Sequence, residues 1–268
     1  MINLGLGKLT RIGLAITFCL AILCIYTPIF VMMVFSFNSS RYQTLPFREF
    51  TTAWYGRVLQ DQNFIDGLTN SLLIAGSVSV LATTLGFLAA YSFEKAKIIG
   101  MPFLLGLLLA PLAFPLILIG ISMRLQATSL GIQPSLWLVA LGQTVYVLPL
   151  AVLNLRVGIA SIAPSLEDAA FSLGASRLRV IIEIVAPACR STIIATLLLT
   201  FTFAFDEFII AYFLTNFEIT LPIKIWTTLV TGFDPKVNAV GTGVFIFSVT
   251  LGLLAQLILL KRQAEKNL

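Results

Sequence analysis

The chain has 268 residues, of which 58% are hydrophobic and 11% are charged, and its formal net charge is +5. A mean hydropathy of +0.99 excludes an ordinary soluble domain and indicates an integral membrane protein. On a soluble surface the excess of basic residues would point to nucleic acid, but in a membrane protein it indicates orientation. We therefore expect no nucleic-acid partner.

Six apolar segments are each long enough to cross a hydrocarbon core, which takes roughly 20 helical residues. They lie near Ile12 to Phe35, Leu68 to Phe93, Ile98 to Met123, Ser135 to Leu155, Ala188 to Phe213 and Ala239 to Leu260. Helices are favoured over a barrel because the segments lack strict alternation and a helix satisfies its own backbone hydrogen bonds in lipid. The predicted fold class is an all-α polytopic membrane protein with six transmembrane helices.

The basic residues divide unequally between the two sides of this topology. One side holds Lys8, Arg11, Lys95, Lys97, Arg156, Arg177, Arg179, Arg190, Lys261, Arg262 and Lys266. The other side holds Arg41, Arg48, Arg57, Arg124, Lys224 and Lys236. By the positive-inside rule, we expect both termini and the central loop to be cytoplasmic.

The central loop, Ser165 to Pro187, is polar and has a helical pattern. Pro164 suits the first turn of a helix, Gly174 suits its C-terminal cap, and Ser176 suits the N-cap of a second short helix. One stripe of the first helix is apolar and consists of Ile162, Leu166, Ala169, Ala170 and Leu173. The polar side chains that lie away from this stripe are Glu167, Asp168 and Ser172. The sequence predicts a helix, a glycine corner and a second helix.

This loop resembles the EAA loop of ABC-importer permeases. Asp168-Ala169-Ala170 is followed by three residues, Gly174, nine residues, Ile184, one residue and Ala186-Pro187, which is the family spacing throughout. Asp168 stands for the usual Glu and Ala186 for the usual Leu. The resemblance implies a type I ABC-importer permease fold in which residues 160–187 form a cytoplasmic coupling loop that docks on an ATPase. The implied coupling residues are Leu166, Glu167, Asp168, Ala169, Ala170, Leu173 and Gly174. A re-entrant or interfacial loop of another membrane protein is the alternative.

The fifth apolar segment contains two adjacent acids, Asp206 and Glu207. Each acid at a helix centre costs roughly 2.5 to 3.5 kcal/mol, so the pair needs water, a cation or a partner. Adjacent helical residues point about 100° apart, so we expect only one carboxylate to face a cavity. Neighbouring aromatic rings can attract an ammonium group. The candidate substrate-pathway residues are Asp206, Glu207, Phe205, Phe208, Tyr212 and, from the fourth segment, Tyr146. Alternatively, the helix ends here and both acids are solvated.

Several other positions predict irregular or closely packed helices. Pro111 and Pro115 predict a kink in the third segment, and Pro149 predicts the same in the fourth, either beside a pathway or from simple packing. Asn70 and Ser71 are expected to open the second helix, with small residues along it for packing. The aromatic residues between positions 38 and 67 indicate an interfacial belt, a short amphipathic surface helix that helps seat a substrate-binding protein, or both.

The segment around the acids carries a second resemblance. FAFDEF, followed by TLPIKIWTTLVTGFDPKVNAVGT, resembles the spermidine/putrescine branch of the permease family. The matching elements are the acidic pair, Thr220-Leu221-Pro222 and Pro235-Lys236-Val237-Asn238-Ala239, with Glu207 where a second Asp is expected. The resemblance implies a polyamine substrate. Another small solute, such as an opine, an amino-acid derivative or a metal-bearing anion, is the alternative.

The chain lacks the residues of common catalytic and metal sites. It has no histidine and three scattered cysteines, and it has no G-x-x-x-x-G-K-[ST] phosphate loop. We therefore expect no catalytic residue, no metal ligand and no cofactor in this chain, which is not expected to be an enzyme. An intramembrane enzyme with a Ser-Lys dyad and an ATPase-independent channel or transporter are the competing classes.

The importer resemblance also implies a set of partners. These are a second permease chain, two cytoplasmic ATPase subunits that bind ATP and Mg, a periplasmic or extracellular substrate-binding protein, and membrane lipid. Residues 1–268 are expected to form a single transmembrane permease domain with a core at 66–262, in a bacterial inner membrane.

Overall fold

The computed structural model describes residues 8–42, 44–95 and 99–266. Contacts between residues divide the chain into two compact units, which are considered separately. The first contains residues up to Asp61 and Thr227–Ile246, and the second contains Gln62–Trp226 and residues from Phe247 onward. Both are built from helices, which confirms the predicted all-α class for the part of the chain described.

Four of the described helices are long and apolar enough to cross a membrane: α1 (Lys8–Phe35), α3 (Gln62–Lys95), α6 (Leu136–Ala160) and α13 (Lys236–Lys266). Two bent pairs also qualify when each pair is taken as one span. One pair is α4 (Met101–Ala113) with α5 (Leu116–Ser129), bent by 101°. The other joins Arg177–Ala188 to α10 (Arg190–Phe205), bent by 77°. The predicted count of six is reached only with both pairs; the predicted start of the third span, Ile98, and the predicted cytoplasmic Lys97 lie outside the described residues.

Proline chemistry explains the first break. Phe114, the residue before Pro115, has φ −89° and ψ 140°, because a following proline disfavours the helical conformation. Pro115 also lacks the N–H needed to continue the helix. The predicted kink is therefore confirmed at Pro115, whereas Pro111 and Pro149 lie inside the helices α4 and α6.

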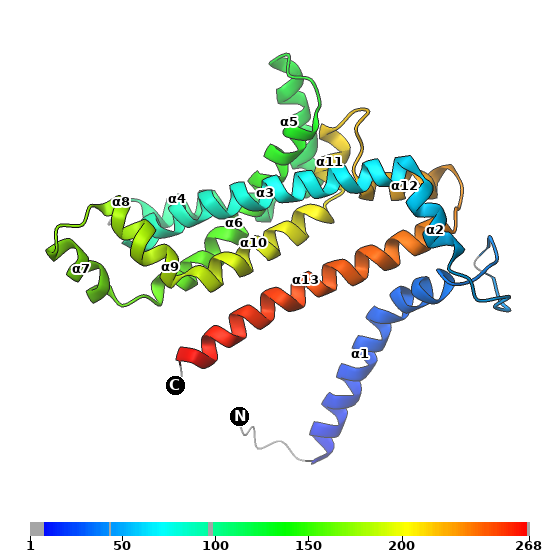
Figure 1. Ribbon diagram of the computed structural model, residues 1–268, viewed down its shortest axis with the longest axis horizontal. Coiled ribbons are helices and arrows are strands. Elements are labelled where there is room, and N and C mark those ends of the chain that lie inside the picture. The colour runs from blue at the N-terminus through cyan, green and yellow to red at the C-terminus, as the bar shows by residue number, and fades with distance from the viewer. Residues whose placement is uncertain (1–7, 43, 96–98, 267–268) are drawn as a thin grey trace. The chain divides into compact units, whose positions relative to one another are not determined.

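Helices α3, α6 and α10 pack side by side in the second unit (Figure 1). A Cβ atom on Gly86 of α3 would lie 2.9 Å from the Cβ of Ala151 in α6, so glycine permits this close approach. The hydroxyl oxygens of Thr83 and Thr200 lie 3.5 Å apart between α3 and α10. These contacts confirm that small and hydroxyl residues of α3 serve helix packing.

The start of α3 differs from the prediction. The helix begins at Gln62, so Asn70 and Ser71 lie inside it. Their side chains bind the start of α12 (Leu221–Thr231) and the residues before it: Asn70 Nδ2 donates to the Ile219 carbonyl at 3.0 Å, and Ser71 Oγ accepts from the Leu221 N–H at 2.9 Å. Polarity at Asn70 and Ser71 therefore marks a helix contact and not a helix end.

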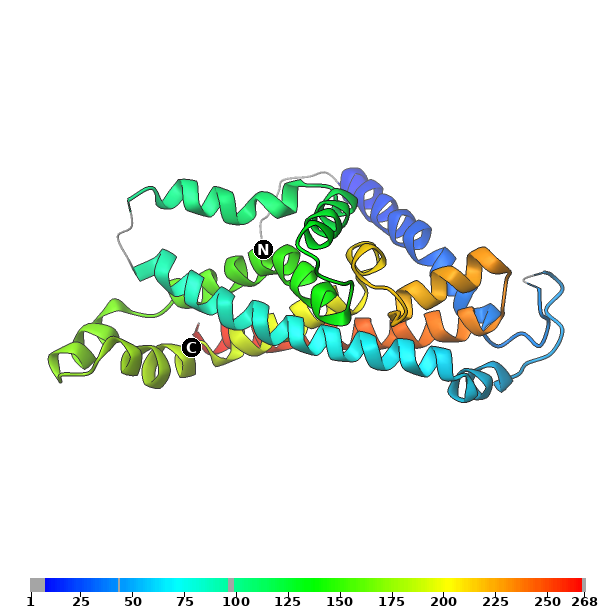
Figure 2. The ribbon, with the colours of Figure 1, turned by 90° about the horizontal axis from the view of Figure 1, so that it is seen from above.

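The central loop folds as predicted, with α7 (Pro164–Ser172) followed by a corner and α8 (Arg177–Val180), a π-helical turn η1 (Ile181–Val185) and α9 (Ala186–Ala188). Gly174 has φ +82°, a conformation that favours glycine. Ser176 Oγ accepts from the Arg179 N–H at 3.4 Å and caps α8. Within the second unit, α7 and α8 lie at one end of the α3–α6–α10 bundle, away from α11 (Ile209–Leu214) (Figures 1 and 2).

The first unit contains the short helix that the sequence offered as an alternative, α2 (Ala53–Gln60). Trp54 is buried, and its Nε1–H donates to the Asn38 carbonyl at 2.8 Å. Phe50 is exposed and stacks on Phe37 with ring centroids 5.0 Å apart. Trp54 therefore anchors this segment inside its unit.

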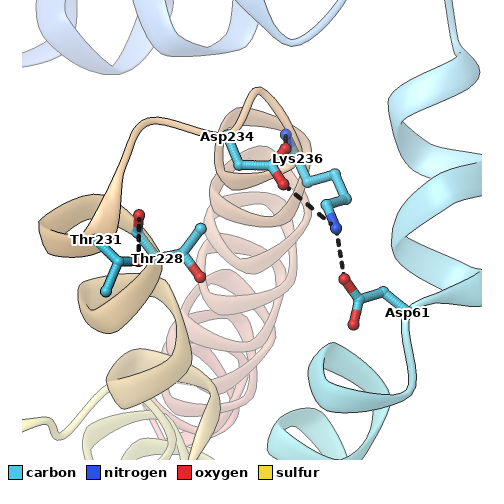
Figure 3. A network of polar contacts seen from close by, with 5 residues as sticks. All are labelled: Asp61, Thr228, Thr231, Asp234 and Lys236. Atoms are coloured by element: carbon cyan, nitrogen blue, oxygen red, sulfur yellow. Dashed lines mark hydrogen bonds and ion pairs between the residues drawn. The ribbon is translucent and has the colours of Figure 1, made fainter.

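An ion-pair network also holds the first unit (Figure 3). The ammonium of Lys236, at the start of α13, lies 2.5 Å from Asp61 Oδ2 and 3.3 Å from Asp234 Oδ2. Asp234 Oδ1 also accepts from the Lys236 backbone N–H at 2.9 Å. The network joins the residue between α2 and α3 to the loop that precedes α13.

Candidate functional site

The acidic pair lies at a break in the backbone. Helix α10 ends at Phe205 and α11 begins at Ile209, so the prediction of one continuous helix through Phe213 is wrong. The carboxylate of Glu207 explains the break, because its Oε1 accepts from the Ile210 N–H at 2.8 Å and its Oε2 from the Ala211 N–H at 3.1 Å. These bonds satisfy donors in the first turn of α11, which have no partner within the helix.

A cavity of about 600 Å³ opens beside this break. It is lined by Leu116, Tyr146, Thr202, Phe203, Asp206, Glu207, Phe208 and Ile209. These residues come from α5, α6, α10, the segment between α10 and α11, and the first residue of α11. The lining residues described here include two acids and no lysine or arginine, so the cavity favours a cation over an anion.

The two carboxylates lie in different surroundings. Glu207 is 7% exposed, and Gln143 Nε2 donates to its Oε2 at 3.1 Å in addition to the two backbone bonds. Asp206 is exposed, and Ser248 Oγ donates to its Oδ2 at 3.0 Å. The oxygens of Glu207 are thus occupied by donors of the protein, and Asp206 is the acid with an accessible carboxylate.

The structure brings together four of the residues predicted for a substrate pathway: Tyr146, Asp206, Glu207 and Phe208. Phe205 is 3% exposed and packs against Phe201 and Phe247, with ring centroids 6.0 and 5.2 Å away, and it is not among the residues that line the cavity. Tyr212 is not among the lining residues, although its ring centroid lies 5.5 Å from that of Phe208.

Sequence reasoning missed several residues of this site. They are the lining residues Leu116, Thr202, Phe203 and Ile209, the hydrogen-bond donors Gln143 and Ser248, and Trp226, whose ring centroid is 5.7 Å from that of Phe208. Thr202 precedes Asp206 by four residues, so helical periodicity would have placed both on one face. Gln143 and Ser248 are polar residues in apolar segments, which is itself a signal of a polar partner.

Replacing Glu207 with glutamine is expected to destabilise the protein. The carboxamide keeps one acceptor oxygen and turns an N–H₂ group toward the α11 donors, which leaves a buried N–H unpaired at a cost of about 1–3 kcal/mol. Thermal unfolding of the purified protein in detergent measures this change. Glu183→Gln, at an exposed acid in η1, is the matched control and should leave the unfolding temperature unchanged. Equal stability of Glu207→Gln and the native chain would contradict the capping role.

The residues predicted for coupling divide between the two faces of α7. Leu166, Asp168, Ala169 and Leu173 are exposed, and Leu173 reaches 89% exposure, whereas Ala170 is buried. Glu167 is 5% exposed, and its carboxylate contacts the Lys95 ammonium at 2.7 Å and the Tyr91 hydroxyl at 3.0 Å. The expectation that Glu167 lies free on the polar face of α7 is therefore corrected, because a basic partner on α3 draws it inward.

The interrupted spans and the two-helix loop at one end of the bundle match the fold of an ABC-importer permease. The crystal structure of a bacterial ABC transporter involved in the import of the acidic polysaccharide alginate has the same fold: it aligns with a TM-score of 0.67 over 96% of this chain and 98% of that chain, at 20% identity. The model of the family described as "Binding-protein-dependent transport system inner membrane component" matches residues 82–262. The chain belongs to this family.

Two relatives from Escherichia coli (strain K12) match along most of their length. The spermidine/putrescine transport system permease protein PotC is 30% identical over 256 residues, which cover 94% of this chain and 95% of the relative. The putrescine transport system permease protein PotI is 28% identical over 254 residues, which cover 90% of this chain and 89% of the relative. The family to which the chain belongs and its candidate membrane spans show that it is a multi-pass component of a bacterial inner-membrane transport system.

Proposed function

We propose that this permease subunit moves polyamine cations across the inner membrane, with Asp206 as the carboxylate that receives an ammonium group. The single observation that carries the proposal is the accessible carboxylate of Asp206 in the cavity at the α10–α11 break. The names of PotC and PotI, which specify spermidine and putrescine, support the same substrate class.

The chemistry of the cavity suits such a cation. A carboxylate interacts more strongly with an ammonium group in a low-dielectric cavity than in water. The ring of Phe208, which lines the cavity, adds an aromatic face that attracts cations. An anionic solute has no basic side chain to bind among the lining residues described.

The transport cycle follows from the position of the loop. ATP-driven closure of two partner ATPase subunits moves α7 as a lever. The helices of the bundle then tilt, so that the cavity opens alternately to one side of the membrane and to the other. The exposed Leu166, Ala169 and Leu173 fill a cleft on the ATPase, and Asp168 holds a basic group there. ATP and Mg stay with those subunits, so this chain carries no catalytic or cofactor-binding residue.

The remaining architecture completes the proposal. Residues 1–268 act as a single permease domain with a core at 66–262, and a second permease chain supplies the other half of the pathway. A binding protein delivers the substrate from outside. The bias of lysine and arginine supports a cytoplasmic location for both termini and the 160–187 loop.

Uptake of labelled spermidine and putrescine by vesicles tests the proposal. The vesicles contain the chain with its second permease, ATPase and binding-protein partners, and ATP hydrolysis is followed in parallel. We expect ATP-dependent uptake of polyamines and none of a neutral or anionic solute. If the complex hydrolyses ATP but ignores polyamines, the substrate class is wrong; if no ATPase assembles with the chain, the proposed importer mechanism is wrong.

A further inference from the structure

Two ion pairs meet in the last turn of α3. Glu94 Oε1 accepts from Arg156 of α6, with Nε and a terminal guanidinium nitrogen each 2.8 Å away. The next residue, Lys95, places its ammonium 2.7 Å from Glu167 Oε1 of α7. The end of α3 is therefore tied both to the helix that leads into the central loop and to the first helix of that loop.

The contact with α7 is well shielded from solvent. The side chain of Glu167 is 6% exposed and that of Lys95 is 22% exposed. Tyr91, four residues before Lys95 on α3, donates its hydroxyl to Glu167 Oε2 at 3.0 Å, so each carboxylate oxygen meets a group from α3. Removing one partner of a buried pair strands the other charge, so this contact resists separation.

Few side chains of α7 are buried. Within α7, Glu167 and Ala170 are the buried residues. A cavity of about 400 Å³ lies beside the ion pair, lined by Tyr91, Ser92, Lys95, Pro164, Glu167, Asp168, Phe171 and Arg177. Residues 161–163 form the link between α6 and α7. The ion pair and the Tyr91 hydrogen bond are thus the polar side-chain contacts described between α7 and α3.

We propose that the Lys95–Glu167 pair, supported by Tyr91, is the contact through which α7 moves α3. This proposal rests on the lever role of α7 in the proposed function. Because α3 packs against α6 and α10, a displacement of α7 that is carried by the pair reaches the end of α10, where Asp206 lies. Glu167 and Lys95 are thus positioning residues and do not contact the substrate.

The test uses the whole complex in vesicles, with Lys95→Met, Glu167→Gln, the double variant, and the exchanged pair Lys95→Glu with Glu167→Lys. Uptake per ATP hydrolysed is expected to fall on the order of tenfold in each single variant, because a coupling free energy of typical size changes an equilibrium by about this factor. The double variant should be no worse than either single one, and the exchanged pair should recover much of the native ratio. A merely structural contact would lower uptake and hydrolysis together and leave their ratio unchanged.

Arg179→Gln is the matched control, because Arg179 pairs with Glu183 in the same loop, 3.1 Å apart, and both side chains are exposed. Native coupling in the single variants, or no recovery in an assembled exchanged pair, would overturn the proposal. If the single variants do not assemble into the complex, the Tyr91→Phe variant is measured in their place. A lower uptake per ATP hydrolysed in this variant supports the proposal, and a native ratio contradicts it. Stimulation of ATP hydrolysis by the binding protein, measured without added polyamine, is a second readout of coupling. Failure of the substrate assignment is therefore distinguishable from failure of the coupling role of this pair.

Discussion

Replacing Asp206 with asparagine is expected to lower polyamine uptake by one to two orders of magnitude, since a hydrogen bond to a charged group contributes about 1.5–3 kcal/mol. Asparagine has nearly the same shape and can still accept the hydrogen bond from Ser248, so the fold should be unchanged. The measurement is the initial rate of labelled putrescine uptake by vesicles that contain the complete complex. Assembly and ATP hydrolysis are measured on the same preparation.

Asp66→Asn is the matched control for this variant. Asp66 is also exposed and also accepts one side-chain hydrogen bond, from Gln62 Nε2 at 2.7 Å, but it does not line the cavity. We expect native uptake from this control. Native uptake from Asp206→Asn as well would refute the role proposed for the accessible carboxylate and would turn attention to the binding protein as the source of selectivity.

Replacing Gly174 with leucine is expected to uncouple ATP hydrolysis from transport. The residue has φ +82°, and a left-handed backbone costs an L-residue with a side chain roughly 1–2 kcal/mol. No heavy atom outside its chain neighbours lies within 4 Å of an added Cβ, so the penalty is conformational and not steric. Relief of this strain changes the angle between α7 and α8, and hydrolysis continues while uptake falls.

Two further variants separate conformation from size. Gly174→Asn should retain more coupling than Gly174→Leu, because asparagine tolerates the left-handed region. Gly76→Ala, at a helical glycine of α3 that also has nothing within 4 Å, should couple normally. Equal and native uptake per ATP in both Gly174 variants would show that the corner angle does not matter for coupling.

The sequence predicted features that depend on local chemistry. Gly174 has the positive φ that favours glycine, and the side chain of Ser176 caps α8. Their positions in the sequence therefore predict where the chain turns between α7 and α8. Pro115 likewise ends α4 through its effect on Phe114. Such features are visible in a single sequence because the residues that cause them are neighbours in the chain.

Features that depend on distant residues were not predicted. Glu167 was placed on a polar face of α7, yet it is buried because Lys95, far away in the sequence, supplies its counter-ion. The break before α11 was only the alternative interpretation, because the apolar letters continue through it. Its cause is the side chain of Glu207, which bonds to the backbone of Ile210 and Ala211 and is buried, not solvated as that alternative assumed. The candidate site was thus found by residue type, but its shape and the division of roles between the acids required coordinates.

The Lys236 network of the first unit and the acid of the cavity differ in what their carboxylates bind. Lys236 belongs to the same chain as Asp61 and Asp234, so a free cation has to compete with a tethered ammonium group for these two acids. Asp206 is bonded to a neutral hydroxyl instead. An ammonium ligand of the kind proposed above therefore displaces no cationic side chain among the described contacts of Asp206, whereas at Asp61 or Asp234 it competes with Lys236.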